Sequence, residues 1–192
     1  MVIAEAQRVV LRCFHVADLD AMAGVFGDPE VMRFGPGPRS RDWVRGWLCG
    51  CLEDYYRKWG FGLWAVVHKP DRRVIGYCGL TRFDDIGGQS EIEIGYRLVR
   101  EFWGRGLATE AARAVRDYAF GVLGLQRLVS IIDPHNGASL RVAEKTGLRY
   151  EKDVIFRENL RRLYVIHQAD LAESGAADVT NVKSPQPEMG AI

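Results

Sequence analysis

Runs of apolar and β-branched residues alternate with polar stretches along the chain, and the first of them predict strands. A first strand is expected over 8–14, and a meander of three antiparallel strands over 61–67, 73–83 and 91–99. These runs are rich in Val, Ile, Tyr and Phe, and short links join them, among them a Gly-Gly turn at 87–88. The first half of the chain therefore predicts an antiparallel sheet.

The longest amphipathic pattern in this half predicts a helix that begins at Ser40 and ends at Gly60. Its apolar residues recur in pairs every four positions, which is the spacing of one helix face. The pairs are Trp43, Val44, Trp47, Leu48, Cys51, Leu52, Tyr55 and Tyr56. We interpret this stripe as core. Shorter helices are expected over 18–26 and from Asp28 onward.

After the meander, the pattern changes to alternating helices and strands. It predicts a helix over 106–123, a strand over 127–133, a helix over 136–146 and two last strands around Tyr150 and Tyr164. The whole pattern predicts an α+β fold, built on a mixed but largely antiparallel twisted sheet of about seven strands with helices on its faces.

Composition narrows the class of protein. The 192 residues suit one domain, and 47% hydrophobic with 27% charged residues can fill a core. We expect the domain to span 1–171 and the polar segment 172–192 to form a flexible tail. A net charge of +1 gives no reason to expect a nucleic-acid or membrane partner. The chain begins without the features of a secretory signal, so a cytoplasmic location is expected.

The cysteines show no pattern of a metal site. Cys13, Cys49, Cys51 and Cys78 have neither C-x-x-C spacing nor a histidine at ligand spacing. We interpret them as reduced core thiols and expect no metal.

The segment with candidate chemistry is the loop that follows the predicted strand 91–99. Gly104 and Gly106 precede a helix, and the first N–H groups of a helix carry partial positive charge and no intrahelical partner. Glycines let an anion approach the backbone closely, and Arg100 and Arg105 add positive charge. The loop alone also fits a tight turn without a ligand. It lacks the G-K-S/T ending of a P-loop and the third small residue of a dinucleotide fingerprint.

Two blocks of sequence favour a ligand-binding role for the loop. Residues 101–111 (EFWGRGLATEA) match both glycine positions of the motif Gln/Arg-x-x-Gly-x-Gly/Ala, and residues 136–147 (NGASLRVAEKTG) match a later N-x-x-S…E-K-x-G helix. Residues 28–32 (DPEVM) look like an opening helix of the same branch. With these blocks the chain, over about 8–171, resembles the GNAT acetyltransferase superfamily, and within it the RimJ/RimL type that acetylates N-termini of ribosomal proteins. The resemblance implies a GNAT-type fold.

The resemblance implies acetyl-CoA as donor and an amine as acceptor. The phosphates would be held at the start of the helix, with Arg100 and Arg105 beside them, and the pantetheine arm would lie along Leu98 and Val99, where the N–H near Leu98 would stabilise the oxyanion. Asn136 would bind amide groups of the arm. The backbone groups expected at the phosphates are those of Gly104, Gly106, Leu107, Ala108 and Thr109.

This sequence departs from the family pattern at two functional positions. Glu101 replaces the usual Gln or Arg and places an acid near the expected phosphates, where Arg100 or Arg105 would compensate. Ala143 stands where many members have a tyrosine that protonates the leaving thiolate. Ser139, a serine often used in the RimJ/RimL type, is therefore the expected general acid.

A carboxylate is also needed, because an amine is mostly protonated at neutral pH. Glu91 and Glu93 lie two residues apart and share one face of the strand. Glu93 is the preferred general base, and a solvent-facing pair of glutamates is the alternative.

Three functions stay open at this point. The first is acetyl transfer from acetyl-CoA to a protein N-terminal amine or a small amine. The second uses another acyl donor such as succinyl-CoA, or an amine-bearing drug as acceptor. The third is a CoA-binding regulator without turnover. A homodimer is expected for this type of protein.

Overall fold

A computed structural model describes residues 1–173, with the backbone alone at 53, 54, 172 and 173. Eight strands form one sheet: β1 (Val2–Glu5), β2 (Val9–Arg12), β3 (Leu63–His68), β4 (Val74–Ile86), β5 (Gln89–Leu98), β6 (Arg127–Ile132), β7 (Arg149–Phe156) and β8 (Asn159–His167). The α-helices are α1 (Leu19–Gly27), α2 (Pro29–Met32), α3 (Arg41–Gly50), α4 (Tyr56–Trp59), α5 (Leu107–Gly121), α6 (Gly137–Thr146) and α7 (Gln168–Glu173). Three further helical turns are η1 (Val16–Asp18), η2 (Cys51–Tyr55) and η3 (Arg100–Phe102).

The sheet confirms the predicted α+β class and adds a strand at one edge. Its order is β1-β2-β3-β4-β5-β6-β8-β7, and every neighbouring pair is antiparallel except β5 and β6. The count of about seven strands misses β1, a four-residue strand that pairs with β2. So short a strand gives too few positions for an alternating pattern to stand out.

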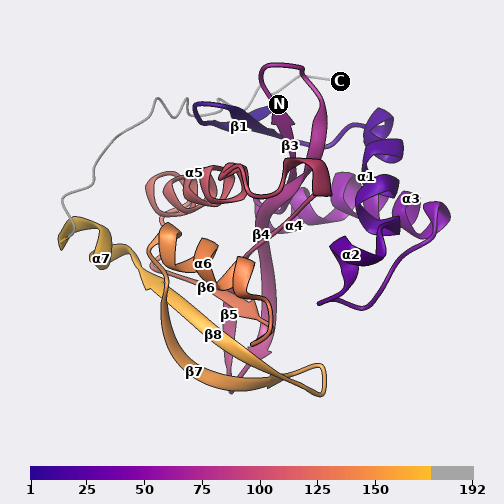
Figure 1. Ribbon diagram of the computed structural model, residues 1–192. Helices are drawn as coiled ribbons and strands as arrows, with labels where there is room; N and C mark the ends of the chain where they lie inside the picture. The colour runs from indigo at the N-terminus through magenta and orange to yellow at the C-terminus, as the bar shows by residue number, and fades with distance from the viewer. Residues whose placement is uncertain (174–192) are drawn as a thin grey trace.

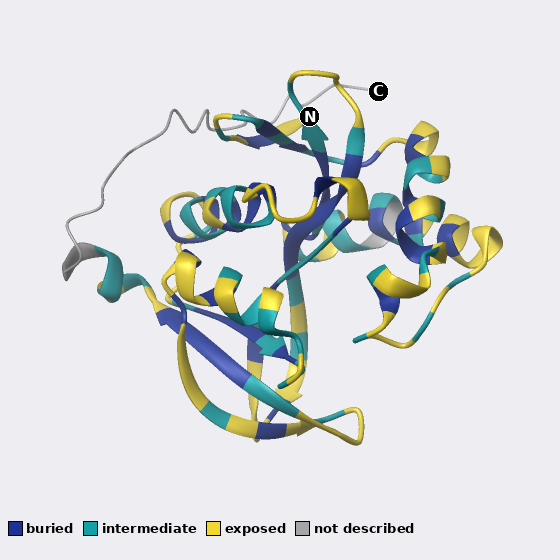
Figure 2. Cartoon of the chain, viewed as in Figure 1, coloured by how far each residue is buried: buried dark blue, intermediate teal, exposed yellow. Residues whose placement is uncertain are grey.

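Helices cover both faces of the sheet (Figure 1). One face packs against α5 and α6, through a core in which Trp64 of β3, Leu80 of β4 and Val115 of α5 are almost wholly buried. The other face packs against α1 and α3, where Met22, Val44 and Tyr77 belong to a second core. Figure 2 shows the buried residues gathered along the strands between these two layers.

The helix predicted from Ser40 to Gly60 is present, with a change of pitch in the middle. The Ser40 hydroxyl accepts a hydrogen bond from the Trp43 N–H at 3.2 Å, α3 passes into the π-helical turn η2, and α4 ends at Gly60 with a φ of 70°. Val44 and Leu48 are buried, whereas Trp43 is 43% exposed. The stripe is core for most of its length, as predicted.

Two other expectations have mixed outcomes. The expected tail begins at 172, but α7 continues to Glu173, and the remainder of that segment lies outside the described residues. Cys51 and Cys78 are buried thiols as predicted, whereas Cys49 is exposed, because it faces away from the apolar stripe of α3. No described helix is long and apolar enough to cross a membrane.

Candidate active site

β5 and β6 separate shortly after they meet, and the opening between them organises the site. The two parallel strands pair only at Glu93 and Val129, and the Ser130 hydroxyl of β6 donates to the Ile94 carbonyl at 3.0 Å. Beyond Ile94, the edge of β5 is no longer covered by β6. Strand backbone that lacks a neighbour can accept an extended ligand in its place.

The direction of the backbone groups follows from one hydrogen bond at the end of β5. The Val99 N–H donates to the Ile75 carbonyl of β4 at 2.9 Å. Successive N–H groups of a strand point to opposite sides, so the Leu98 N–H points away from β4 and into the opening. The Leu98 carbonyl accepts a hydrogen bond from the Trp103 indole N–H at 2.7 Å. The Leu98 N–H thus points into the opening, and its role as an oxyanion donor stays a prediction.

The glycine loop after β5 has the conformation that an anion-binding helix start requires. Gly104 and Gly106 have φ values of 72° and 78°, which side-chain-bearing residues rarely adopt. No side chain caps α5, so the N–H groups of Leu107, Ala108 and Thr109 begin the helix without a side-chain acceptor. A Cβ added at Gly104 would meet nothing within 4 Å. The loop therefore fits a pyrophosphate.

Arg8, which the sequence did not single out, braces this loop from the far edge of the sheet. Its side-chain Nε donates to Glu110 of α5 at 2.8 Å, its backbone N–H donates to the same carboxylate, and its Nη1 donates to the Arg105 carbonyl at 3.0 Å. Another guanidinium nitrogen lies 3.5 Å from where a Cβ on Gly106 would be. Arg8 both holds the loop and brings positive charge to it. No local signal could reveal it, because Arg8 and Arg105 lie 97 residues apart in the sequence.

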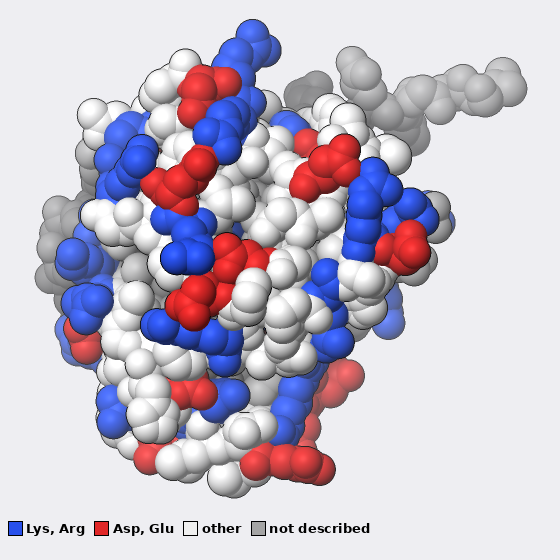
Figure 3. All heavy atoms as spheres, turned by 45° about the vertical axis from the view of Figure 1, so that its right-hand side comes forward, with Lys and Arg blue, Asp and Glu red and all other residues white. Residues whose placement is uncertain are grey.

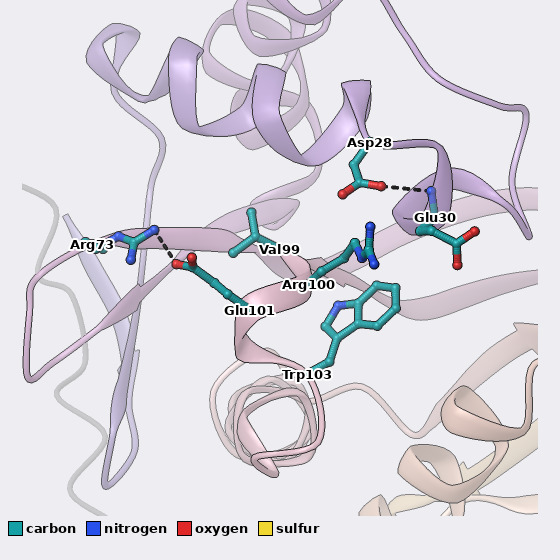
Figure 4. A pocket seen from close by; sticks show the side chains of 7 residues that line it. All are labelled: Asp28, Glu30, Arg73, Val99, Arg100, Glu101 and Trp103. Carbon is teal, nitrogen blue, oxygen red and sulfur yellow. Dashed lines mark hydrogen bonds and ion pairs between the residues drawn. The ribbon is translucent and has the colours of Figure 1, made fainter.

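Glu101 has a different partner from those expected. It forms a salt bridge with Arg73 of the turn between β3 and β4, whereas Arg105 lies over the Phe102 ring at 5.2 Å and Arg100 lines a hollow beside α2. Figure 4 shows the Glu101–Arg73 pair at one end of this hollow and Trp103 at the other. Arg73, and not Arg100 or Arg105, is therefore the salt-bridge partner of Glu101.

Glu93 and Glu91 share a strand face but have different environments. Arg127 binds the buried Glu91 carboxylate at 2.9 Å, and Gln89 donates to it at 2.6 Å, so this group is fully engaged. Glu93 accepts one hydrogen bond, from the Ile131 N–H at 3.3 Å. Burial raises the pKa of Glu93 to about 7. A carboxyl group with that pKa can take a proton from an ammonium group near neutral pH. The alternative of a solvent-facing pair is wrong.

Asn136 and Ser139 meet at the start of α6, as the sequence suggests. The Asn136 side-chain oxygen accepts a hydrogen bond from the Ser139 N–H at 3.1 Å and caps the helix. Its role in the structure is therefore that of a cap. The Ser139 hydroxyl accepts a hydrogen bond from the Tyr96 hydroxyl at 3.1 Å. Burial raises the pKa of Tyr96 to about 12, so this phenol stays protonated at neutral pH.

Tyr96 is a site residue that sequence reasoning missed. It lies on the face of β5 opposite Glu93, between Ile94 and Leu98, and reaches α6 across 43 positions of sequence. The position where family members often carry a tyrosine is Ala143, which is buried. The structure thus supplies a phenol beside Ser139 from a strand instead of from the helix. The alternation of β5 could have placed Tyr96 on the α6 side, but not its partner.

The described part of the chain shows neither a reactive buried thiol nor a group of metal ligands at the site. Burial raises the pKa of Cys78, so this thiol stays protonated and is a poor nucleophile. Within residues 1–173, no three His, Cys, Asp or Glu side chains come together as a metal-binding group.

Comparisons with known proteins agree with this geometry. Residues 8–149 match the model of the acetyltransferase (GNAT) domain family. The chain is 36% identical over 148 residues to the uncharacterized protein YkkB of Bacillus subtilis (strain 168), covering 77% of this chain and 85% of YkkB. It is 28% identical over 124 residues to the spermidine N(1)-acetyltransferase of Escherichia coli (strain K12), covering 61% and 66%. A solved acetyltransferase from Agrobacterium tumefaciens str. C58 superposes with a TM-score of 0.74 at 28% identity, covering 87% and 95%.

Proposed function

The chain belongs to the GNAT acetyltransferase family, and from that premise we propose that it transfers an acetyl group from acetyl-CoA to a primary amine by direct attack on the thioester. The arrangement around the split between β5 and β6 carries this proposal. It brings a carboxyl group with a pKa of about 7, a strand N–H and a serine hydroxyl to one opening, with the uncapped start of α5 beside it.

Each residue has one task in the proposed reaction. Glu93 accepts a proton from the ammonium form of the acceptor, directly or through water, which leaves a neutral amine as nucleophile. A carbon–nitrogen bond then forms at the acetyl carbonyl, and the Leu98 N–H stabilises the negative charge on its oxygen. The carbon–sulfur bond breaks as Ser139 donates a proton to the departing sulfur, which leaves as the CoA thiol. The new amide nitrogen releases its extra proton to water, from which the Ser139–Tyr96 pair regains the proton it gave. Tyr96 donates a hydrogen bond to Ser139 and is positioned to replace that proton.

The phosphates of acetyl-CoA would lie at the glycine loop. The backbone N–H groups of Gly104, Gly106 and the first turn of α5 would bind them, and Arg8 holds this loop in place through its hydrogen bond to the Arg105 carbonyl. Asn136 caps α6 with its oxygen, which leaves its amide nitrogen to bind the pantetheine arm.

Calorimetric titration with acetyl-CoA, succinyl-CoA, free CoA and NAD in parallel cells tests the donor. We expect saturable binding of the CoA compounds and none of NAD, followed by release of free thiol when amines are added. Preference for succinyl-CoA would support the alternative acyl donor. Binding without thiol release for any amine would support a regulator. Absence of CoA binding would reject the proposal.

Finer assignments are part of the same proposal. We assign the chain to the RimJ/RimL type on the sequence of its blocks at 101–111 and 136–147, and we expect a homodimer and a cytoplasmic location. A protein N-terminus and a small amine are both candidate acceptors at this level.

A further inference from the structure

Arg97 lies on the Glu93 face of β5 and is held in place from two sides. Its Nη1 donates to the Tyr77 hydroxyl of β4 at 2.6 Å, and Tyr77 is buried. Its Nη2 lies so close to Gly35, in the segment between α2 and α3, that a Cβ there would come within 2.4 Å of it. The guanidinium is therefore fixed between the sheet and this segment. Glycine at position 35 leaves it the necessary space.

In the described part of the chain, Arg97 is a partly buried arginine without a salt bridge, unlike Arg12 and Arg127. Arg12 binds Asp18 at 2.7 Å, and Arg127 binds Glu91 at 2.9 Å. Among the side chains that the structure describes, no carboxylate forms a salt bridge with Arg97. Its partner is the neutral Tyr77 hydroxyl. A partly buried guanidinium that forms no salt bridge can bind an anionic group of a ligand.

The charges around Glu93 also favour an anionic group on the ligand. Positive charge on Arg97 and Arg157 lowers the pKa of Glu93 against the larger effect of burial, so both cations lie within electrostatic reach of the base. The other acid of this strand face, Glu91, is neutralised by Arg127. On the face shown in Figure 3, acidic and basic side chains are interleaved, so no broad field of one sign steers the acceptor. The charges close to Glu93 therefore determine which acceptor is favoured.

One glycine separates the base from the cation on this face of β5. Glu93 and Arg97 are four residues apart on one strand, about 13 Å between Cα atoms at the usual rise. The residue between them on this face is Gly95, which has no side chain, and a carboxylate oxygen of Glu93 lies 3.5 Å from where a Cβ on Gly95 would be. Glu93 thus leans along the strand toward Arg97. Among the described residues beyond its two chain neighbours, only Glu93 has atoms within 4 Å of where a Cβ on Gly95 would be, so this stretch of the strand has a proton acceptor at one end and a cation at the other.

We propose that Arg97 binds a carboxylate of the acceptor, so that the amine acetylated at Glu93 belongs to an amino acid or a similar small zwitterion. This inference rests on the proposed function and specifies its substrate class. A guanidinium binds a carboxylate through two parallel hydrogen bonds, which would fix the amine relative to Glu93. A polycation such as a polyamine would meet Arg97 and Arg157 as like charges.

Matched acceptors test the inference with the full chain and acetyl-CoA. L-Phenylalanine, L-leucine and L-methionine are each compared with the amine left when the carboxyl group is removed, and spermidine and an N-terminally free tetrapeptide amide are added. Thiol release is expressed per neutral amine, to remove the effect of different amine pKa values. We expect kcat/KM to be at least about tenfold higher with the carboxylate than without it.

Variants assign that preference to Arg97. Arg97→Gln should abolish the preference for the carboxylate, mainly through KM, and leave the Kd for acetyl-CoA unchanged. Gly35→Ala should do the same in part, because the new methyl group displaces the guanidinium without touching backbone conformation. Arg45→Gln, the same change at an exposed arginine of α3, is the matched control and should keep the parent preference.

The outcomes distinguish a failure of the carboxylate site from a failure of the proposed function. Equal rates with and without the carboxylate, faster turnover of spermidine or the tetrapeptide amide, or turnover of none of these amines by a protein that binds acetyl-CoA would each overturn the carboxylate site. A preference that survives in Arg97→Gln would also overturn it. Failure to bind acetyl-CoA would instead reject the proposed function.

Discussion

On the face of β5 that packs against α5 and α6, the chemistry comes from backbone groups and one short helix motif. On the opposite face, which packs against α1 and α3, it comes from side chains of β5 itself, which groups from β4 and β6 hold in place. The first face offers the Leu98 N–H at the strand edge and Tyr96 on Ser139. The second offers Glu93 and Arg97.

This difference explains which part of each face can change between related proteins. A backbone site binds phosphates and amides whatever the side chains are, provided that glycines permit the loop, so the α5 side suits a ligand common to a whole family. Side chains on the other face can change without altering the strand. An acceptor pocket made from them can differ between relatives that share the donor site. Variants on the two faces should therefore affect the acceptor and the donor separately.

The largest expected effect comes from the acceptor face. Glu93→Gln should lower kcat by about 100-fold or more, because the amide cannot accept the amine proton. In the parent, kcat should rise as the pH increases through about 7, where Glu93 loses its proton, and this rise should vanish in the variant. The acetyl-CoA Kd should stay the same. A variant with parent rates at every pH would remove Glu93 from the mechanism.

Stability supplies a control for this variant. The folded-state pKa of Glu93 is about 7 against an ordinary 4.5, so the folded protein binds the proton more tightly than the unfolded chain does. The free energy of unfolding should therefore fall as the pH rises from about 4.5 to about 7, by roughly 3 kcal/mol, and change little above that. Glu93→Gln should remove this decrease and be more stable than the parent at pH 8. Denaturant titrations at several pH values measure it.

The next effect belongs to the donor face. Gly106→Val should weaken acetyl-CoA binding about 100-fold, because a β-branched residue at a φ of 78° distorts the loop and its side chain crowds the phosphate path. Gly124→Val is the matched control, since Gly124 has a φ of 66° in the connection between α5 and β6. Both variants should lose stability, but only Gly106→Val should lose affinity in calorimetry. If Gly106→Val binds acetyl-CoA with unchanged affinity, the loop is a turn that takes no part in phosphate binding.

A third comparison tests the hydroxyl pair at the opening. Ser139→Ala should lower kcat by about 30-fold and Tyr96→Phe by about tenfold, since the phenol acts through the serine. The double variant should be no slower than Ser139→Ala alone, because removing the serine leaves the phenol nothing to support. Steady-state kinetics at saturating acetyl-CoA measures all three. Effects that multiply in the double variant would mean that Tyr96 acts independently.

The sequence predicted the parts of this molecule that are local. The strands of the meander, the helix from Ser40, the glycine loop and the helix that begins after Asn136 each depend on neighbouring residues, and all are present. It favoured Glu93 as the base but could not show that Glu91 is engaged elsewhere, because Arg127, which binds Glu91, lies 36 residues away from it.

The contacts that the sequence missed are all long-range. Arg8 at the glycine loop, Tyr96 at Ser139 and Arg97 at Tyr77 join segments that only the sheet order brings together. A single sequence contains the residues of such pairs but not their pairing.

The smallest expected effect concerns Glu101, the acid at the edge of the donor face. Its salt bridge with Arg73 joins two side chains that are about half exposed, so breaking it should change the free energy of unfolding by less than about 1 kcal/mol. Arg73→Gln should nevertheless weaken acetyl-CoA binding about threefold, because it leaves the Glu101 charge uncompensated beside the phosphates. Glu101→Gln in the same chain should restore the affinity, and this rescue should fade at high salt. If Arg73→Gln binds acetyl-CoA as the parent does at low salt, Glu101 lies beyond the electrostatic reach of the phosphates, and the departure from the family motif at this position has no cost for the donor face.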